Sequence, residues 1–436
     1  MTRMSAPPER GIWAAIRAFA RHRWGGFADR AAIETHQRRE WARMRRDLLP
    51  LTGFYRGLDP ADPHDLPAMD RDRLMAEFDG LTTSGLTRAE AEAMARSAEP
   101  GAPALPSRRD GLAAGFSTGT SGRRGLYVTG PAERRLWAGA LAGRFWPRPA
   151  LRPQRTALFL RADNRLYDAL NAGPLRLRFF GAMLPAEVHV AGIAEFDPTV
   201  LAGPPSTLLA LAEALAALGL RLRPSVVLCG AEPAEPQDLS RLEQAFGIRP
   251  DIIYQCTEGV LAMTCRHGRL HLNEGHIAFR REVIDAGTGA FLPIISDLSR
   301  RSLMVLNYRL DDVLLPDPEP CPCGCASTGI ARIEGRLDDA IFLPAPDGMR
   351  WISSEALRRI AFGIPGVRDW ALAQTAPDRL RFHLTGADPA AALPQLRAAC
   401  AELAHRKGCV IPRIEVSTQM PAADGVKRRR ILRLFA

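Results

Sequence analysis

The sequence predicts an α/β fold made of two domains, and three observations support this prediction. From about residue 116 onward, short apolar runs alternate with helical patterns, which is typical of an α/β core. After about residue 335 the pattern changes to that of a compact α+β unit. The length of 436 residues also exceeds that of one ordinary domain. We therefore expect a large domain over residues 1–335 and a small domain over residues 336–436.

The N-terminal third of the large domain is predicted to be mainly helical. Residues 1–50 have helical patterns, and residues 60–110 indicate short helices joined by loops that contain Pro and Gly. The first helix is amphipathic, because Ile12, Ile16 and Phe19 lie on one face. We expect that face to pack on the body of the protein; the alternative is contact with a membrane surface or a partner.

Two helices have clear predicted ends. Leucines at helical spacing between Ser206 and Gly219 predict a helix that the serine caps and the glycine ends. In the small domain, the apolar positions 393–403 line a second helix that Gly408 ends. Extended runs are predicted at 380–384 and 411–416.

Two strands are predicted to bring polar motifs together. The apolar run SVVLC (225–229) predicts a buried strand, and DIIYQ (251–255) predicts the next strand, after a helix at 237–246. The strands should be parallel, so GAEP (230–233) and TEG (257–259) should lie at one edge of the sheet. In open α/β sheets this edge is where ligands bind.

The composition excludes several classes of protein. No stretch approaches the ~18 uninterrupted apolar residues of a membrane span, so no transmembrane segment is expected. The net charge of +10 comes from scattered arginines without interleaved aromatics, which argues against a nucleic-acid partner. The N-terminus lacks a small-residue cleavage site, and eight cysteines without a secretory signal indicate a cytoplasmic protein.

The segment FSTGTSGRRG (116–125) predicts a polyphosphate-binding loop. Its glycines let backbone amides approach an anion, its hydroxyls add donors, and Arg123 and Arg124 supply positive charge. It is not a Walker A loop, because that spacing and its lysine are absent. The alternative is a flexible surface turn. The candidate phosphate ligands are Ser117, Thr118, Gly119, Thr120, Ser121 and Gly122.

The segment IYQCTEG (253–259) has the side chains that a nucleotide site needs. Tyr254 can stack on a purine, Thr257 can donate to a phosphate oxygen, and Glu258 can ligate a divalent cation. We interpret the neighbouring Cys256 as pocket lining; the alternative is a nucleophile.

Six motifs follow one another in the order found in the acyl-adenylate-forming superfamily. They are the Ser/Thr/Gly loop, GAEP, YQCTE (254–258), NYRLDD (307–312), GRLDD (335–339) and a C-terminal lysine. From about residue 60 onward the chain resembles this superfamily, and in particular its phenylacetate–coenzyme A ligase branch. The resemblance implies the two-domain adenylate-forming fold, with a small, mobile α+β lid. It implies ATP- and Mg²⁺-dependent adenylation of an aryl or fatty acid, then acyl transfer to a thiol of coenzyme A or a carrier protein.

The resemblance also implies individual roles. Thr257 would bond the α-phosphate, Glu258 would ligate Mg²⁺, and Lys427 would bridge the substrate carboxylate and the α-phosphate. A compact ammonium suits that task, and Lys427 is one of only two lysines in the chain; the alternative is a solvated basic tail. Asp312 would accept the ribose hydroxyls, and Asp338 would lie at the hinge. The remaining nucleotide contacts would come from the phosphate loop, Gly230, Ala231, Glu232, Pro233, Tyr254 and Arg336.

A structural zinc site is predicted from four donors. Cys265, His271, Cys321 and Cys323 supply three thiolates and an imidazole, which is a common tetrahedral zinc set. Cys325 could replace either neighbouring thiol. The alternative is a group of free cysteines.

The chain departs from the superfamily pattern at three places. Leu310-Asp311 replaces Thr-Gly before Asp312, and Val426 separates Gly425 from Lys427. The segment AIFLPAPDGMRWIS (340–353) replaces the strand and Arg-Gly turn that line the pantetheine tunnel. Transfer to coenzyme A is therefore open, and a carrier-protein thiol, an amine or a hydroxyl are alternative acceptors.

Two other functions are alternatives: transfer of AMP to a non-carboxylate small molecule, and a nucleotide-binding pseudoenzyme. The acid is not readable from the sequence, because Tyr167, Phe179 and Phe180 can line its pocket or belong to the core. The expected partners are a small-molecule carboxylate, and as options an acyl carrier protein or a second copy of the chain in a homodimer.

Overall fold

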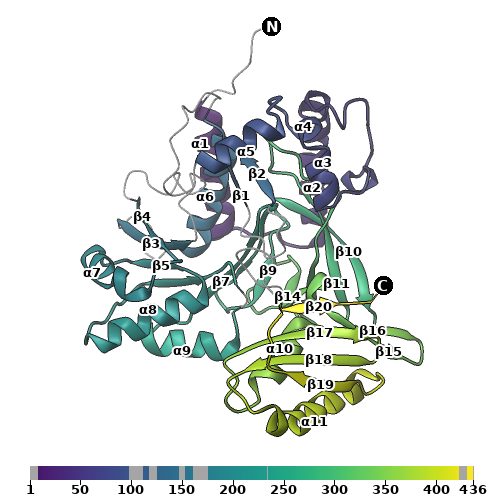
Figure 1. Ribbon diagram of the computed structural model, residues 1–436. Coiled ribbons are helices and arrows are strands. Elements are labelled where there is room, and N and C mark those ends of the chain that lie inside the picture. The colour runs from purple at the N-terminus through teal and green to yellow at the C-terminus, as the bar shows by residue number, and fades with distance from the viewer. Residues whose placement is uncertain are drawn as a thin grey trace.

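The computed structural model confirms the predicted α/β class (Figure 1). A twelve-stranded sheet forms the main body, a separate four-stranded sheet forms a second body, and two hairpins complete the strands. Within the described part of the chain, no helix combines the length and the apolar character needed to cross a membrane. The structure describes residues 8–97, 111–116, 125–146, 153–160, 175–232, 234–421 and 430–435.

Helices dominate the N-terminal region, as predicted. Asp29 caps the second of them by accepting a hydrogen bond from the backbone N–H of Ala32. The elements are α1 (Pro8–Trp24), α2 (Arg30–Asp47), the 3₁₀ turns Leu49–Leu51 and Pro63–Asp65, α3 (Arg71–Ala76), α4 (Phe78–Leu81) and α5 (Arg88–Ser97).

Helix α1 packs against α6 (Pro131–Phe145), so the helix lies on the body as predicted. The predicted face needs a correction, because Ile16 is 49% exposed and the contacts with α6 come from Ala15 and Phe19. The two backbones touch, because a Cβ on Gly139 would lie 2.2 Å from the carbonyl oxygen of Ala15. A Cβ on Gly143 would lie 2.4 Å from the carbonyl oxygen of Phe19. The crossing is therefore possible only with small residues on α6.

Replacing Gly139 with valine is expected to lower the free energy of unfolding by roughly 2 kcal/mol, because the new side chain must push α1 away. Chemical denaturation monitored by circular dichroism measures the change. Gly26→Ala is the matched control, since no atom lies within 4 Å of a Cβ built there. Equal stabilities for Gly139→Val and the wild type would contradict the packing described.

The first half of the large sheet is parallel, with the strand order β4-β3-β5-β6-β7. Helices α7, α8 and α9 cover one face, where Val227 and Cys229 point. Helix α6 covers the other face, where Val226 and Leu228 point, so alternate residues of one strand fill two cores. The bounds are β3 (Gln154–Leu160), β4 (Leu175–Gly181), α7 (Ala186–Phe196), β5 (Val200–Gly203), α8 (Pro205–Ala217), β6 (Val226–Cys229), α9 (Pro236–Phe246) and β7 (Asp251–Cys256).

The predicted start of α8 needs a correction. The helix begins at Pro205, with Pro204 as its N-cap, so Ser206 does not cap it. Proline has a fixed φ and no N–H, which suits the first helical position and starts the helix earlier. The Ser206 hydroxyl instead donates to the Glu232 carboxylate at 2.6 Å. Gly219 follows the helix end with a φ of 67°, as a left-handed stop.

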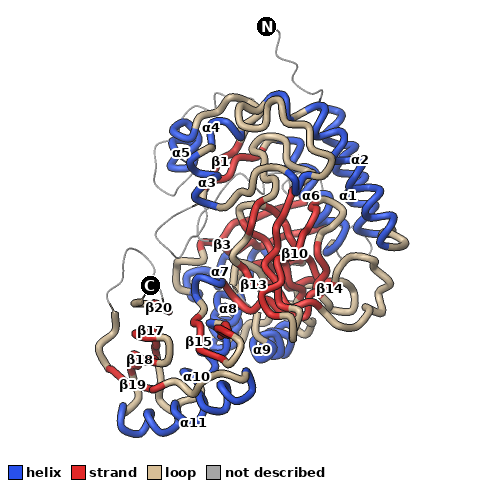
Figure 2. The backbone as a smooth tube through the Cα atoms, turned by 90° about the vertical axis from the view of Figure 1, so that its right-hand side faces the viewer, coloured by secondary structure: helices blue, strands red, loops and turns tan. Residues whose placement is uncertain are grey.

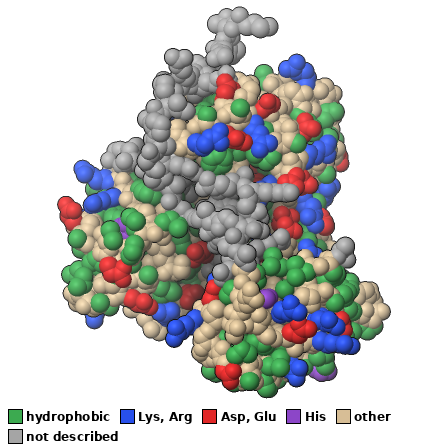
Figure 3. Space-filling view, viewed as in Figure 1, with side chains coloured by type: hydrophobic (Ala, Val, Ile, Leu, Met, Phe, Trp, Pro, Cys, Tyr) green, Lys and Arg blue, Asp and Glu red, His purple; other side chains and the backbone are tan. Residues whose placement is uncertain are grey.

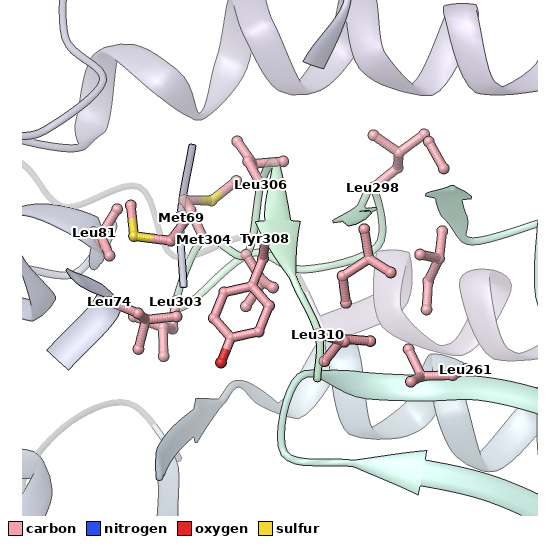
Figure 4. Close-up of a cluster of buried hydrophobic side chains, with 14 of the residues drawn as sticks. Met69, Leu74, Leu81, Leu261, Leu298, Leu303, Met304, Leu306, Tyr308 and Leu310 are labelled. Atoms are coloured by element: carbon pink, nitrogen blue, oxygen red, sulfur yellow. The ribbon is translucent and has the colours of Figure 1, made fainter. Parts of the chain in front are cut away.

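The second half of the large sheet is antiparallel and packs against α2 to α5. Figure 4 shows the shared core, in which the Tyr308 ring lies among Met69, Leu303 and Leu310. The bounds are β8 (Gly259–Thr264), β9 (Leu270–Leu272), β10 (Ile277–Asp285), β11 (Ala290–Asp297), β12 (Tyr308–Arg309), β13 (Asp312–Pro316) and β14 (Gly329–Arg336).

The second body has its own core and lies beside one end of the large sheet (Figure 2). Its sheet has the order β19-β18-β17-β20, and Gly408 ends α11 in the left-handed region, as predicted. Strand β19 begins later than predicted, because Ile411 precedes Pro412 outside the strand and is exposed. The bounds are the 3₁₀ turn Leu337–Asp339, β15 (Ile341–Ala345), β16 (Gly348–Ile352), α10 (Ser354–Phe362), β17 (Asp369–Ala376), β18 (Arg379–Thr385), α11 (Pro389–Lys407), β19 (Arg413–Ser417) and β20 (Ile431–Arg433).

Candidate active site

Strands β6 and β7 are parallel neighbours, so the segments that follow them meet at one sheet edge, as predicted. Gly230 lies against β7, and a Cβ on it would lie 2.9 Å from Cγ2 of Ile253. Ala231 turns the chain with a φ of 64°, in the left-handed region that a side chain disfavours. The backbone at this corner is therefore held close to the strand that carries Tyr254. Of the GAEP motif, Pro233 lies outside the described residues.

Tyr254, Asp312 and Arg336 form a linked group of side chains. The Tyr254 hydroxyl donates to Asp312 Oδ2 at 2.5 Å, and Arg336 Nε lies 3.4 Å from Asp312 Oδ1. Burial raises the pKa of Asp312, while the Arg336 guanidinium and the tyrosine hydroxyl oppose this shift. Burial, followed by the charge of Asp312, also raises the pKa of Tyr254 well above its ordinary value, so the phenol stays a donor. The group thus presents a carboxylate acceptor beside an aromatic ring.

Glu258 lies next to this group and is held by two hydroxyls. Tyr308 donates to Oε1 at 2.8 Å, and the Thr257 hydroxyl donates to Oε2 at 2.8 Å. Two such donors fix the orientation of the carboxylate and leave lone pairs for a cation. Burial raises the pKa of the Tyr308 phenol, and Glu258 raises it further.

Cys256 points into the same region. Burial raises the pKa of its thiol well above the ordinary range, and Glu258 and Asp312 raise it further. A thiol that resists deprotonation is a poor nucleophile, so the interpretation of Cys256 as pocket lining is favoured.

A β-hairpin leads into the predicted phosphate loop. Strands β1 (Ala113–Phe116) and β2 (Leu126–Thr129) are antiparallel, and Phe116 pairs with Leu126 at the end of the hairpin from which the loop leaves. The loop residues Ser117, Thr118, Gly119, Thr120, Ser121 and Gly122 lie outside the described residues, as do Arg123, Arg124 and Lys427.

The described chain resumes at Arg430, three residues after Lys427. Its Nη1 donates to Asp369 Oδ1 at 2.6 Å and to the Trp370 carbonyl at 2.9 Å. Arg430 is therefore bound to β17 where the described chain resumes.

The four residues predicted to form a zinc site lie close together: Cys265, His271, Cys321 and Cys323. One donor atom from each lies within 4.8 Å of the others. The Cys265 and Cys321 sulfurs are 3.6 Å apart, and Cys323 Sγ is 3.5 Å from His271 Nε2. Tetrahedral zinc–thiolate geometry requires sulfurs about 3.8 Å apart, so the set fits a zinc ion.

The orientation of His271 fits the same ligand. Its Nδ1 lies 3.0 Å from the carbonyl oxygen of Ser327, and an N–H donated there leaves Nε2 free to bind a metal. The four donors join the end of β8, β9 and the loop before β14. Cys325 lies beside them, with its backbone N–H 3.4 Å from Cys323 Sγ.

Phe180 belongs to the hydrophobic core, which decides one alternative left open by the sequence. It is buried, and its ring stacks on Phe159 with centroids 5.2 Å apart. Phe179 is partly buried, and Tyr167 lies outside the described residues.

Sequence reasoning assigned no role to three side chains next to the candidate site: Tyr308, Arg300 and Glu133. Tyr308 could have been noticed, because it stands in the NYRLDD motif four residues before Asp312. Arg300 carries no signal in a chain so rich in arginine. Glu133 resembles any acidic residue in the first turn of a helix.

No protein-family model matches the sequence, and no curated protein matches it. Several solved structures are similar to this chain over most of its length. An open conformation of 2-hydroxyisobutyryl-CoA ligase, in complex with 2-HIB-AMP and CoA, is 19% identical and covers 97% of this chain and 90% of its own, with a TM-score of 0.55. The same ligase in the postadenylation state with 2-HIB-AMP has a TM-score of 0.56, at 18% identity and with 98% and 88% covered.

The chain has the adenylate-forming ligase fold. A variant of an amide bond synthetase from Marinactinospora thermotolerans is similar over 76% of this chain and 70% of its own, at 17% identity and a TM-score of 0.51. Because the likeness to the CoA ligase covers nearly the whole chain, the adenylate-forming fold includes both the large sheet and the second body. At identities below 20%, these structural similarities show the fold alone, and the evidence for an activity lies in the site.

Proposed function

We propose that this protein uses ATP to convert a carboxylic acid to an acyl-adenylate and then passes the acyl group to a nucleophile. The observation that carries the proposal is the meeting of Tyr254, Asp312 and Glu258 at one sheet edge of an adenylate-forming fold. An aromatic face suits adenine, an acceptor-only carboxylate suits the ribose diol, and a second carboxylate suits Mg²⁺. The sequence motifs favour the phenylacetate–coenzyme A ligase branch.

In the proposed first step, a carboxylate oxygen of the acid attacks the α-phosphorus, and the bond to pyrophosphate breaks. Thr257 and Lys427 would stabilise the charge that builds on the α-phosphate oxygens. Bound Mg²⁺ would neutralise phosphate charge, and Glu258 would hold it. The remaining phosphate contacts would come from residues 117–122, and Arg336 would reach the ribose or a phosphate.

The two bodies support a second step after a domain movement. We place the domain boundary at Gly335-Arg336 and the hinge at Asp338, which lies in the 3₁₀ turn after β14. Rotation about this turn would withdraw Lys427 and admit the acceptor, as the resemblance implies. The acceptor's nucleophile then attacks the acyl carbonyl, and AMP leaves.

Coenzyme A is the acceptor we favour, and a carrier-protein thiol, an amine or a hydroxyl are outcomes of the same test. The prolines that departed from the family pattern lie in the β15–β16 hairpin, which keeps its pairing from Ile341↔Ile352 to Ala345↔Gly348. The prolines therefore do not interrupt the pairing of this hairpin. A reducing cytoplasm suits both a thiol acceptor and the free cysteines.

Pyrophosphate exchange into ATP tests the proposed function. A panel of aryl and fatty acids should include at least one that stimulates exchange of labelled pyrophosphate, because only the adenylation step is reversible by pyrophosphate. Exchange that needs no carboxylate but needs another small molecule would support adenylyl transfer to that molecule instead. ATP binding without exchange for any acid would support a pseudoenzyme.

We also propose that Cys265, His271, Cys321 and Cys323 hold a structural zinc ion. Metal analysis of the purified protein should return about one zinc per chain, since a set of three thiolates and one imidazole is a closed structural site. Cys321→Ser should lose the metal and lower the melting temperature. Cys409→Ser, which alters a partly buried thiol in the second body, is the control. If the purified wild type contains no zinc and Cys321→Ser melts at the wild-type temperature, the cysteines are free.

A further inference from the structure

A buried ion pair lies behind the Thr257–Glu258 turn. Arg300 and Asp297 are each 1% exposed, and Arg300 Nε lies 3.6 Å from Asp297 Oδ2. Ser299 holds the carboxylate in place, because its backbone N–H and its hydroxyl donate to Oδ1 at 2.8 and 2.6 Å. Removing two charges from water is costly, so stability alone explains such a pair poorly.

The guanidinium of Arg300 joins two segments that are far apart in sequence. Nη1 donates to the carbonyl oxygen of Val128 at 3.3 Å, and Nη2 donates to the carbonyl oxygen of Thr257. Val128 lies in β2 of the hairpin, and Thr257 begins the TEG motif. The Trp137 ring, 5.1 Å from the guanidinium carbon, covers this planar group. Because the fork is rigid, it fixes the separation of the two carbonyls.

Residues around Arg300 contact the same two segments, the TEG turn and the β1–β2 hairpin. A Cβ on Gly259 would lie 3.0 Å from Asp297 Oδ2, so the TEG turn rests directly on the ion pair. On the hairpin side, the buried Glu133 accepts hydrogen bonds from the N–H groups of Arg301 and Ser302 at 2.6 and 3.0 Å. Glu133 also accepts from the Ser302 hydroxyl at 2.6 Å and from the N–H of Gly130, just after β2.

We infer that Arg300 is a positioning residue that sets the β1–β2 hairpin at a fixed distance from Thr257 and Glu258. The inference rests on the proposed function, in which the hairpin side binds phosphates and Glu258 binds Mg²⁺. Arg300 acts through two backbone carbonyls and through the Asp297 carboxylate. Its loss should therefore weaken binding of the Mg²⁺–ATP complex rather than remove a reacting group.

Arg300→Lys is the variant that tests the inference, because an ammonium keeps the charge but cannot span both carbonyls as a planar fork. The Kd of Mg²⁺–ATP, measured by calorimetry without any acid, should rise about ten- to a hundredfold, as for groups that orient metal ligands. The Mg²⁺ concentration that gives half-maximal ATP binding should rise with it. Loss of stability alone would leave these constants unchanged in the folded fraction.

Arg155→Lys is the matched control. Arg155 Nε also donates to two backbone carbonyls, those of Phe196 and Asp197, at 3.0 and 2.6 Å, far from the candidate site. This variant should bind Mg²⁺–ATP as the wild type does. If Arg300→Lys does the same, the inference is overturned.

Two further measurements separate the possible failures. If Arg300→Lys does not fold, Ser299→Ala, which only loosens Asp297, should raise the same Kd by a smaller factor, and an unchanged Kd would overturn the inference. If the wild type binds Mg²⁺–ATP but no acid of the panel stimulates pyrophosphate exchange, the proposed reaction is refuted. The affinity of Arg300→Lys would still decide the positioning role.

Discussion

Replacing Glu258 with glutamine is expected to lower carboxylate-dependent pyrophosphate exchange by about a hundred- to a thousandfold. The amide has nearly the same shape, and its oxygen can still accept the hydrogen bond that Tyr308 donates at 2.8 Å. The negative charge for Mg²⁺ is lost, so the effect should come from electrostatics rather than from misfolding. Exchange rates measured over a range of Mg²⁺ concentrations, with the folded state checked by circular dichroism, give the result.

Glu415→Gln is the matched control for this change. Glu415 is a carboxylate paired with Arg381 at 2.8 Å, and it lies in β19 of the second body. Its replacement should leave exchange unchanged. Full activity of Glu258→Gln at low Mg²⁺ would remove Glu258 from the proposed site.

Replacing Lys427 with alanine is expected to reduce adenylation by a similar factor, about a hundred- to a thousandfold. The ammonium is proposed to bring together the acid carboxylate and the α-phosphate, two anions that repel each other. Breakdown of a preformed acyl-adenylate by an added nucleophile should be much less affected, because the lysine is proposed to withdraw before acyl transfer. Pyrophosphate exchange measures the first step, and single-turnover reaction of isolated acyl-adenylate measures the second.

The chain offers an unusually clean control for this variant. Lys407 is the only other lysine, and it lies in the last turn of α11 with its ammonium 5.6 Å from the centre of the Trp351 ring. Lys407→Ala should adenylate normally. Equal exchange rates for the wild type and for Lys427→Ala would mean that the lysine belongs to a solvated basic tail.

Local patterns allowed much of the large sheet to be predicted. The apolar runs at 225–229 and 251–255 became adjacent parallel strands, since short buried runs separated by a helix pack in this way. The convergence of the four proposed zinc ligands could also be predicted, because a metal site requires particular ligand types in small numbers. The start of α8 was missed by two residues, because the helix begins at Pro205 with Pro204 as its N-cap rather than after Ser206.

Long-range contacts could not be predicted from these patterns. The contact of Gly139 with Ala15 joins two helices more than a hundred positions apart. The residues of neither helix indicate which helix it packs against. Arg300 reaches Val128 across 172 positions, and nothing separates it from the other arginines. Tyr308 reaches Glu258 across 50 positions, from a strand that pairs with β11 rather than with β7.

In the proposed first step, a carboxylate oxygen of the acid attacks the α-phosphorus of ATP. An acid labelled with oxygen-18 in its carboxylate tests this directly, with hydroxylamine added to release the acyl group. We expect one labelled oxygen in the AMP, because the bridging oxygen stays with phosphorus when the acyl carbon is attacked. AMP free of label, formed while the acid is consumed, would contradict it.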